Sequence, residues 1–459
     1  MAIGAGRRFR LGRGTTPLAE AIDTEVPGSS APITAGGVRP KRSRGVSVRT
    51  FDSLSDRSFR WYFFSMLGWF ASMNMQQLAR GVIVYDMTGS YAALGLISLA
   101  NAVPGLFLAL PGGLVADRVS CKLVVQLGQI ANTAVASSIA VLMLMGAITF
   151  EYLLIGAVLQ GGVNAIIMPA RQSMIPEMVS RERLMNAVAL SSAGTNVMLL
   201  AAPPVGGLLL AFIGPGWVYM AMATLYLSGA ACLLPVRRSP EATAQKEAQR
   251  NARSGSASSY KAMLHDLAEG CRYMTRDRVI FMILGMSFMI VALSQPYQMM
   301  LPGFAKDILG ASPGELGVLM SLTGLGALFG SLIVASMPAR RRGLVLLGSA
   351  LVMGLTTLAF SLSESLWLTA GIVFAIGIGQ SGRMSLSNVL IQSYTDTEYR
   401  GRVMSVYMME FSLVAFGTFF VGILSNAIGV QAALAATATG LIIFSALAVL
   451  LFPRMRRLD

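Results

Sequence analysis

The chain has 459 residues, of which 54% are hydrophobic and only 13% are charged. Soluble domains carry about 25% charged residues, so this composition excludes a soluble protein, a disordered chain or a disulfide-rich scaffold and predicts a protein that crosses a membrane many times. The 36 Lys and Arg outnumber the 22 Asp and Glu, for a net charge of +14, which we assign to cytoplasmic loops rather than to a nucleic-acid partner.

The chain begins with a segment rich in Gly, Ser, Pro and Arg, for which we expect a disordered basic tail. Apolar stretches close to the ~20 residues that a helix needs to cross a bilayer follow it. Their predicted bounds are 60–85, 91–116, 122–147, 151–173, 186–212, 216–235, 278–301, 314–337, 343–362, 366–391, 402–428 and 431–452. The sequence therefore predicts an all-α membrane protein with twelve transmembrane helices.

A polar stretch separates the first six helices from the last six. The expected parts are a cytoplasmic tail at 1–58, a six-helix bundle at 59–236, a cytoplasmic linker at 237–277, a second six-helix bundle at 278–453 and a cytoplasmic tail at 454–459. This division places one bundle on each side of the linker.

The charges in the loops alternate from one side to the other. Cations gather in one set of loops and at the C-terminus, at Arg118, Lys122, Arg181, Arg183, Arg340, Arg341, Arg342, Arg400, Arg402, Arg454, Arg456 and Arg457. The opposite loops hold Asp86, Glu151, Asp307, Glu315 and Glu364, with Lys306 as their cation. Because basic loops stay in the cytoplasm, we expect both termini to be cytoplasmic.

The two six-helix halves resemble each other in sequence. The stretch from Tyr85 to Gly95 returns as Lys306 to Gly317, at an offset of 221 or 222, and Gly206 falls on Gly422 at an offset of 216. A nearly constant offset indicates a duplication, and parallel repeats suit transporters whose two bundles rock about a site between them.

Several kinds of active site have no residues to build them. The chain lacks a Gly-x-x-x-x-Gly-Lys-Ser/Thr phosphate loop, and His265 is its single histidine. No cysteine pair has the spacing of metal ligands, so we expect no metal site, no cofactor, no catalytic residue and no enzyme activity.

The loop between the second and third predicted helices carries a compact polar motif. It reads Gly113-Leu-Val-Ala-Asp117-Arg118-Val-Ser-Cys-Lys122, which resembles the signature Gly-x-x-x-Asp-Arg-x-Gly-Arg-Arg/Lys of the major facilitator superfamily. Four further stretches resemble the exporters of enterobactin and macrolides within it, namely 85–90, 168–172, 301–305 and 400–405. The resemblance covers about residues 58–452 and implies a secondary transporter.

The same motif supplies a candidate cytoplasmic gate. A carboxylate at Asp117 could accept hydrogen bonds from the start of the eleventh helix or pair with an Arg there. The gate residues would be Gly113, Asp117, Arg118, Arg400 and Arg402. The alternative is that these cations merely flank the membrane on its cytoplasmic side.

Polar side chains also occur within the predicted spans, where they must face protein or water. The substrate-cavity candidates are Asn74, Gln76, Gln77, Arg80, Gln160, Asn164, Ser294, Gln298 and Gln380. They lie on helices 1, 4, 7 and 10, which line the central cavity in the superfamily that the chain resembles. The alternatives are hydrogen bonds between helices of a static bundle and, for Arg80 and Arg171, side chains that reach out to the membrane surface.

Glu410 is the acid placed well inside a predicted span, and Arg383 lies at a similar depth on the preceding helix. A charged carboxylate inside a bilayer is costly, which suits a group that binds and releases a proton. Glu410 with Arg383 is therefore the candidate site of proton coupling, and a purely structural ion pair is the alternative.

These patterns predict a monomeric secondary transporter in the bacterial cytoplasmic membrane, whose partners are a small-molecule substrate, protons and the lipid bilayer. We expect it to export a small amphipathic molecule, siderophore-like or drug-like. The alternatives are an importer or facilitator of a metabolite, and a membrane scaffold that does not transport. The three embedded Arg against one Glu favour an acidic substrate.

Overall fold

The computed structural model of the chain describes residues 52–179, 181–236, 269, 272–337, 341–397 and 399–451. The predicted tails, up to residue 51 and from residue 452, lie outside these residues, as does most of the predicted linker with His265. The side chains at 109–118, which include the gate candidates Gly113, Asp117 and Arg118, lie outside the description as well.

The described part of the chain is built from helices. In chain order they are η1 (Asp52–Ser55), α1 (Arg57–Thr88), α2 (Tyr91–Arg118), α3 (Cys121–Leu144), α4 (Phe150–Met178), α5 (Arg181–Ile213), α6 (Pro215–Cys232), α9 (Arg278–Ser294), α10 (Pro296–Asp307), α11 (Pro313–Ser336), α12 (Arg342–Ser361), α13 (Leu366–Tyr394), α14 (Arg400–Met408), α15 (Glu410–Ile428) and α16 (Val430–Leu451). The predicted all-α fold is confirmed.

Nine stretches among the described helices are long and apolar enough to cross a membrane. Helices α1, α6 and α13 complete a set that is consistent with the predicted twelve spans. Several helices run past the predicted bounds, because capping side chains lie outside the apolar stretch; Asp56, for example, accepts hydrogen bonds from the amides of Ser58 and Phe59 and starts α1 at Arg57.

Two predicted spans are interrupted. The seventh divides into α9 and α10 because Pro296 has no amide hydrogen to continue the ladder. The eleventh divides into α14 and α15 at Met409, whose amide donates to Val406 in a tighter turn. The second break makes Glu410 the first residue of a helix instead of a residue in the middle of one.

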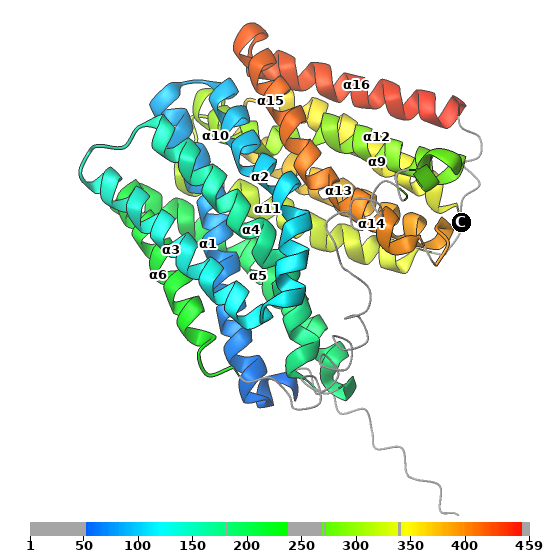
Figure 1. Cartoon of the computed structure of the whole chain (residues 1–459). Coiled ribbons are helices and arrows are strands. Elements are labelled where there is room, and N and C mark those ends of the chain that lie inside the picture. The colour runs from blue at the N-terminus through cyan, green and yellow to red at the C-terminus, as the bar shows by residue number, and fades with distance from the viewer. Residues whose placement is uncertain are drawn as a thin grey trace, which may run out of the picture. The chain divides into compact units, whose positions relative to one another are not determined.

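The helices pack as two halves with a definite seam (Figure 1). In the N-terminal half α2 packs on α4, α3 packs on α6, and α1 packs on both α5 and α6. In the C-terminal half α13 packs on α11 and α12, and α12 also contacts α16. The seam is formed where α2 meets α15 and α5 meets α11. The second helix of each half therefore meets the fifth helix of the other half, so the two contacts are equivalent, as expected for a duplicated chain.

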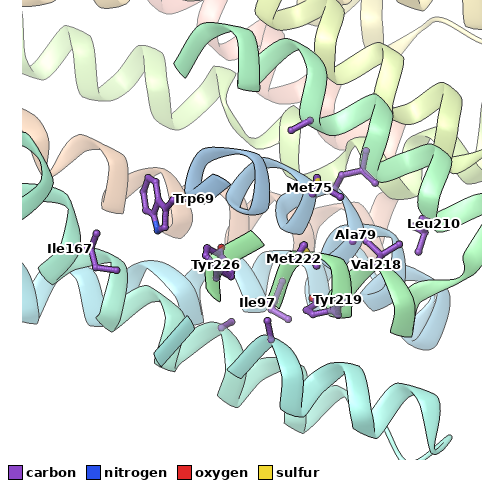
Figure 2. Close-up of a cluster of buried hydrophobic side chains, with 14 of the residues drawn as sticks. Trp69, Met75, Ala79, Ile97, Ile167, Leu210, Val218, Tyr219, Met222 and Tyr226 are labelled. Carbon is purple, nitrogen blue, oxygen red and sulfur yellow. The ribbon is translucent and has the colours of Figure 1, made fainter. Parts of the chain in front are cut away.

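The hydrophobic core crosses the seam at one level. Figure 2 shows part of its N-terminal component, where Trp69, Met75, Met222 and Tyr226 lie buried. The same cluster extends into residues of α10, α11, α15 and α16, such as Phe304. A separate cluster at the other end of the C-terminal half holds residues of α9, α12 and α13, such as Leu346. The two halves thus share a core near Phe304.

Candidate functional site

Residues of both halves meet in a polar cluster near the ends of α1 and α10, which we call the Asp307 end. Asp307 accepts a hydrogen bond from the Tyr85 hydroxyl and a second, of 3.0 Å, from the Tyr91 hydroxyl. Beside it, the Lys306 ammonium lies 2.5 Å from the Asp86 carboxylate. Three contacts of α1 and α2 with α10 therefore join the two halves here, and we call these five residues the Asp307 lock.

The sequence repeat explains the arrangement of this lock. Tyr85-Asp86 and Lys306-Asp307 are equivalent positions in the two halves. Tyr85 binds Asp307, and Asp86 binds Lys306, so each member of one copy contacts the opposite member of the other copy. A two-fold relation between equivalent helices produces such crossed pairs. Asn426 adds a bond on α15, where its side chain accepts from the Tyr91 amide at 2.9 Å.

Two equivalent glycines allow the helices to approach closely below this lock. A Cβ atom added at Gly95 would lie 2.7 Å from Cα of Phe419 on α15, and one added at Gly317 would lie 2.5 Å from the carbonyl oxygen of Pro203 on α5. Such distances exclude any side chain without a backbone shift. These glycines hold the seam closed at the Asp307 end.

A small cavity lies between the halves, inward of the Asp307 lock. It measures about 60 Å³, which holds one or a few water molecules, whereas drug-sized ligands need roughly 300–1,000 Å³. Its polar lining comes from Gln77 and Arg80 of α1, Ser98 and Asn101 of α2 and Gln298 of α10. Three of the predicted cavity residues therefore lie together between the halves, in a space closed to a substrate in this conformation.

The C-terminal half encloses a buried ion pair. Nη1 of Arg383 lies 2.5 Å from Oε1 of Glu410, and their side chains are 5% and 7% exposed. Ser287 on α9 donates to Oε2 of Glu410 at 3.0 Å and accepts from Arg383 at 3.2 Å. The hydroxyl of Ser387 on α13 lies 3.2 Å from that of Ser287 and can donate to it. Both predicted coupling residues thus lie in one bonded cluster.

A further side chain adjoins this cluster at the junction of two helices. Glu410 is the first residue of α15, directly after the turn at Met409. Tyr407 on α14 faces the same cluster and interacts with both Arg383 and Glu410. Protonation of Glu410 would remove the charge that balances Arg383 and weaken the bonds of Glu410 to Arg383 and Ser287.

Other predicted cavity residues bond within their own half. The Gln76 side-chain amide donates to Gln160 on α4 at 2.7 Å, and the Tyr226 hydroxyl donates to Oε1 of Gln76 at 3.4 Å. Asn164 accepts a bond from Asn132 on α3 at 3.1 Å, and the Asn74 amide bonds to its own helix. The bonds of Gln76, Gln160 and Asn164 join helices, whereas that of Asn74 stays within α1. Their place in a substrate cavity stays a prediction.

The last two cavity candidates lie in the C-terminal half. Ser294 is buried at the end of α9, with its hydroxyl lacking a hydrogen-bond partner in the structure. Gln380 is half-buried on α13. They stay predictions.

The candidate gate residues at the opposite end are only partly described. Arg400 is exposed, and Arg402 lies 2.8 Å from Glu269 and over the ring of Tyr399. The side chain of Asp117 lies outside the described part, so the expected contact between Asp117 and these cations stays a prediction.

Sequence reasoning missed most of the partners that complete these clusters. Tyr91 in the lock, Asn426 next to it and Ser287 beside Glu410 are ordinary polar residues in apolar stretches. The signal that could have found the lock was the repeat itself, because equivalent acids and their neighbours in two halves are candidates for crossed pairs.

Comparison with known proteins gives a consistent assignment. The family described as transmembrane secretion effectors matches residues 48–459. The staphyloferrin A transporter of Staphylococcus aureus is 21% identical over 359 residues, which are 73% of this chain and 82% of that protein. The enterobactin exporter EntS of Shigella boydii is 26% identical over 416 residues, 87% of this chain and 93% of that protein.

The fold is also similar to solved structures. A bacterial homologue of the lysosomal transporter Spinster, in an inward-facing and unoccupied conformation, superposes with a TM-score of 0.68 at 16% identity. The match covers 88% of this chain and 98% of that structure. At this identity the likeness establishes the fold.

Proposed function

Because the chain belongs to the transmembrane secretion effector family of the major facilitator superfamily, and is thus a multi-pass membrane transporter and not an enzyme, we propose that it exports a small amphipathic molecule in exchange for protons. It acts as a monomer in the bacterial inner membrane, with both termini in the cytoplasm. In that orientation the Asp307 end faces outward, since the loops at the opposite end carry the cations.

The buried pair of Glu410 and Arg383 carries the proposal of proton coupling. Removing one member of such a pair leaves an uncompensated buried charge, which is strongly unfavourable. Protonation of Glu410 removes its charge in the same way, so proton binding would change the relative stability of the two conformations of the transporter. Ser287, which contacts both members, would transmit this change to α9.

The Asp307 lock supports alternating access. It joins α1 and α2 to α10, and Asn426 adds a bond to α15, where the hydrophobic core is continuous across the seam. With the Asp307 end outward, the described conformation is closed to the outside, and the substrate would enter from the cytoplasm. Release requires the lock to open, because the cavity of about 60 Å³ behind it is too small for a substrate.

The relatives support the kind of substrate. Two of them are named for staphyloferrin A and for enterobactin, which favours a siderophore-like or drug-like molecule over a simple metabolite. Gln77, Asn101 and Gln298 line the cavity and would bond carbonyl or hydroxyl groups of such a molecule without selecting its charge.

Inverted membrane vesicles that contain the full chain test the proposal. Respiration acidifies their lumen, and a proton-coupled exporter then accumulates fluorescent amphiphiles inside. We expect Glu410→Gln to abolish this accumulation but to keep exchange of labelled for unlabelled amphiphile. The matched control is Glu364→Gln, since Glu364 is an exposed acid between α12 and α13. Accumulation that persists unchanged in the Glu410 variant refutes the coupling site.

The same vesicles separate an exporter from an importer or facilitator of the same fold. A facilitator equilibrates the amphiphile whether or not respiration is active. An importer accumulates it in right-side-out vesicles instead. Either result would replace the proposed direction of transport.

A further inference from the structure

Arg171 is a buried cation without a described counter-charge. It lies on α4 inside the N-terminal half, and the residue is 3% exposed. None of its three guanidinium nitrogens, Nε, Nη1 and Nη2, has a hydrogen-bond partner in the structure. Arg383, by contrast, is buried to a similar extent and is paired with Glu410. The buried Arg of the C-terminal half is therefore paired with an acid, whereas no described acid pairs with the buried Arg of the N-terminal half.

Among the described residues, the surroundings of Arg171 offer an aromatic face but no acid. Its guanidinium carbon lies 4.8 Å from the ring centre of Trp69 on α1. The titratable groups that interact with it are Tyr62 and Tyr226, whose hydroxyls are neutral at pH 7. The Tyr62 hydroxyl donates to the backbone oxygen of Arg171 at 3.1 Å. The buried Nε1 of Trp69 also lacks a partner in the structure, so the site presents unpaired N–H donors beside neutral tyrosine hydroxyls.

The contact with Trp69 leaves the N–H donors of the guanidinium available. The guanidinium carbon lies over the ring, none of the three nitrogens has a partner in the structure, and such donors suit a carboxylate or another anion. The guanidinium stays protonated in proteins. Its burial also rules out the alternative that this side chain reaches the membrane surface, so its charge must be balanced inside the protein.

We propose that Arg171 and Trp69 form an anion-binding site within the N-terminal half, separate from the cavity beside Gln77 and Arg80. The ligand is a small anion or an acidic group that lies in the plane of the guanidinium. This chemistry has two possible sources, a free inorganic anion that resides in the half and the acidic group of the transported amphiphile. The proposal stands on the burial and contacts of Arg171 and does not depend on the direction or coupling of transport.

Thermal unfolding of the purified full-length protein in detergent tests the site. Sodium gluconate, whose hydroxyl groups are too strongly hydrated for a buried site beside Trp69, keeps the ionic strength constant while it is replaced by sodium chloride, sodium acetate or sodium 1-naphthylacetate. A ligand that binds only the folded state raises the unfolding midpoint as its concentration rises. We expect such a rise with at least one of these anions and none with the neutral 1-naphthylacetamide.

Variants test whether the rise in the unfolding midpoint comes from binding at Arg171. Arg171→Gln removes the charge and should lose the rise, and because it also removes an unpaired buried cation it should fold as stably in gluconate as the unchanged protein. Arg171→Lys keeps the charge without the planar fork and should bind at least tenfold more weakly. Arg60→Gln, at an exposed position of α1, makes the same change in net charge and should keep the full rise.

The arms of the experiment identify the source of the anion. A rise with chloride or acetate indicates a resident free anion, and a rise with 1-naphthylacetate alone indicates the acidic group of an amphiphile. A midpoint that is indifferent to all of these anions, or a rise that persists in Arg171→Gln, overturns the proposal. Failure of proton-driven export in vesicles would leave the unfolding result unaffected, so the two proposals fail separately.

Discussion

Removal of the Glu410 carboxylate should destabilise the protein more than removal of the whole ion pair. Glu410→Gln preserves the shape of the side chain but leaves Arg383 buried and charged. Breaking a buried pair in this way costs about 3–5 kcal/mol. The new amide can still accept one bond from Arg383, which offsets about 1 kcal/mol, so we expect a loss of about 2–4 kcal/mol in the free energy of unfolding.

The double variant provides the decisive comparison. Glu410→Gln together with Arg383→Gln removes both charges, and the replacement of a buried pair by neutral groups is often neutral or stabilising. The assay is equilibrium unfolding in mixed micelles of dodecyl maltoside and dodecyl sulfate, followed by circular dichroism. A single variant within about 1 kcal/mol of the unchanged protein, or a double variant no more stable than the single one, would refute the argument that this charge is balanced by its partner.

Three further predictions concern the Asp307 lock, the seam and the N-terminal segment. Asp307→Asn weakens two hydrogen bonds at an exposed site, which costs about 1 kcal/mol and shifts the equilibrium about fivefold toward the state open at this end. An impermeant maleimide should then label Gln77→Cys more strongly, in a chain without Cys121, Cys232 and Cys271. Unchanged labelling contradicts the lock. Gly95→Val should increase the same labelling, because a valine side chain cannot fit against α15. Gly440→Val should not, because a side chain at that position meets nothing within 4 Å. Equal effects of the two substitutions would argue against the close seam. Deletion of residues 1–51 should leave accumulation in vesicles unchanged, and its loss would favour a scaffold that recruits partners through this segment.

The helices and the pairing of the halves could be predicted because they follow from local patterns. Apolar length sets the spans, and the offset between Gly95 and Gly317 indicates the duplication that the structure realises as two equivalent close contacts. The pairing of Glu410 with Arg383 could also be proposed, since few charges occur within the spans. The break before Glu410 could not, because the turn at Met409 contains no proline or glycine.

It was harder to predict which neighbouring helix or cavity each polar side chain meets. Gln76 and Gln77 are neighbours in sequence, yet Gln76 bonds to α4 inside the half and Gln77 lines the cavity between the halves. Helical spacing shows which residues share a face but not which neighbour that face meets. The burial of Arg171 was equally hidden, since the position of Trp69 over it depends on how α1 and α4 pack.

Proton movement in proteoliposomes tests the coupling of Glu410 most directly. A pH-sensitive dye trapped inside vesicles of the purified protein reports proton flux while a gradient of a transported amphiphile is applied. We expect protons to move opposite to the amphiphile, and the Glu410→Gln protein to move the amphiphile down its gradient without protons. Proton flux that is unchanged in the Glu410 variant, or absent from the unchanged protein while amphiphile moves, would show that Glu410 does not couple transport to protons.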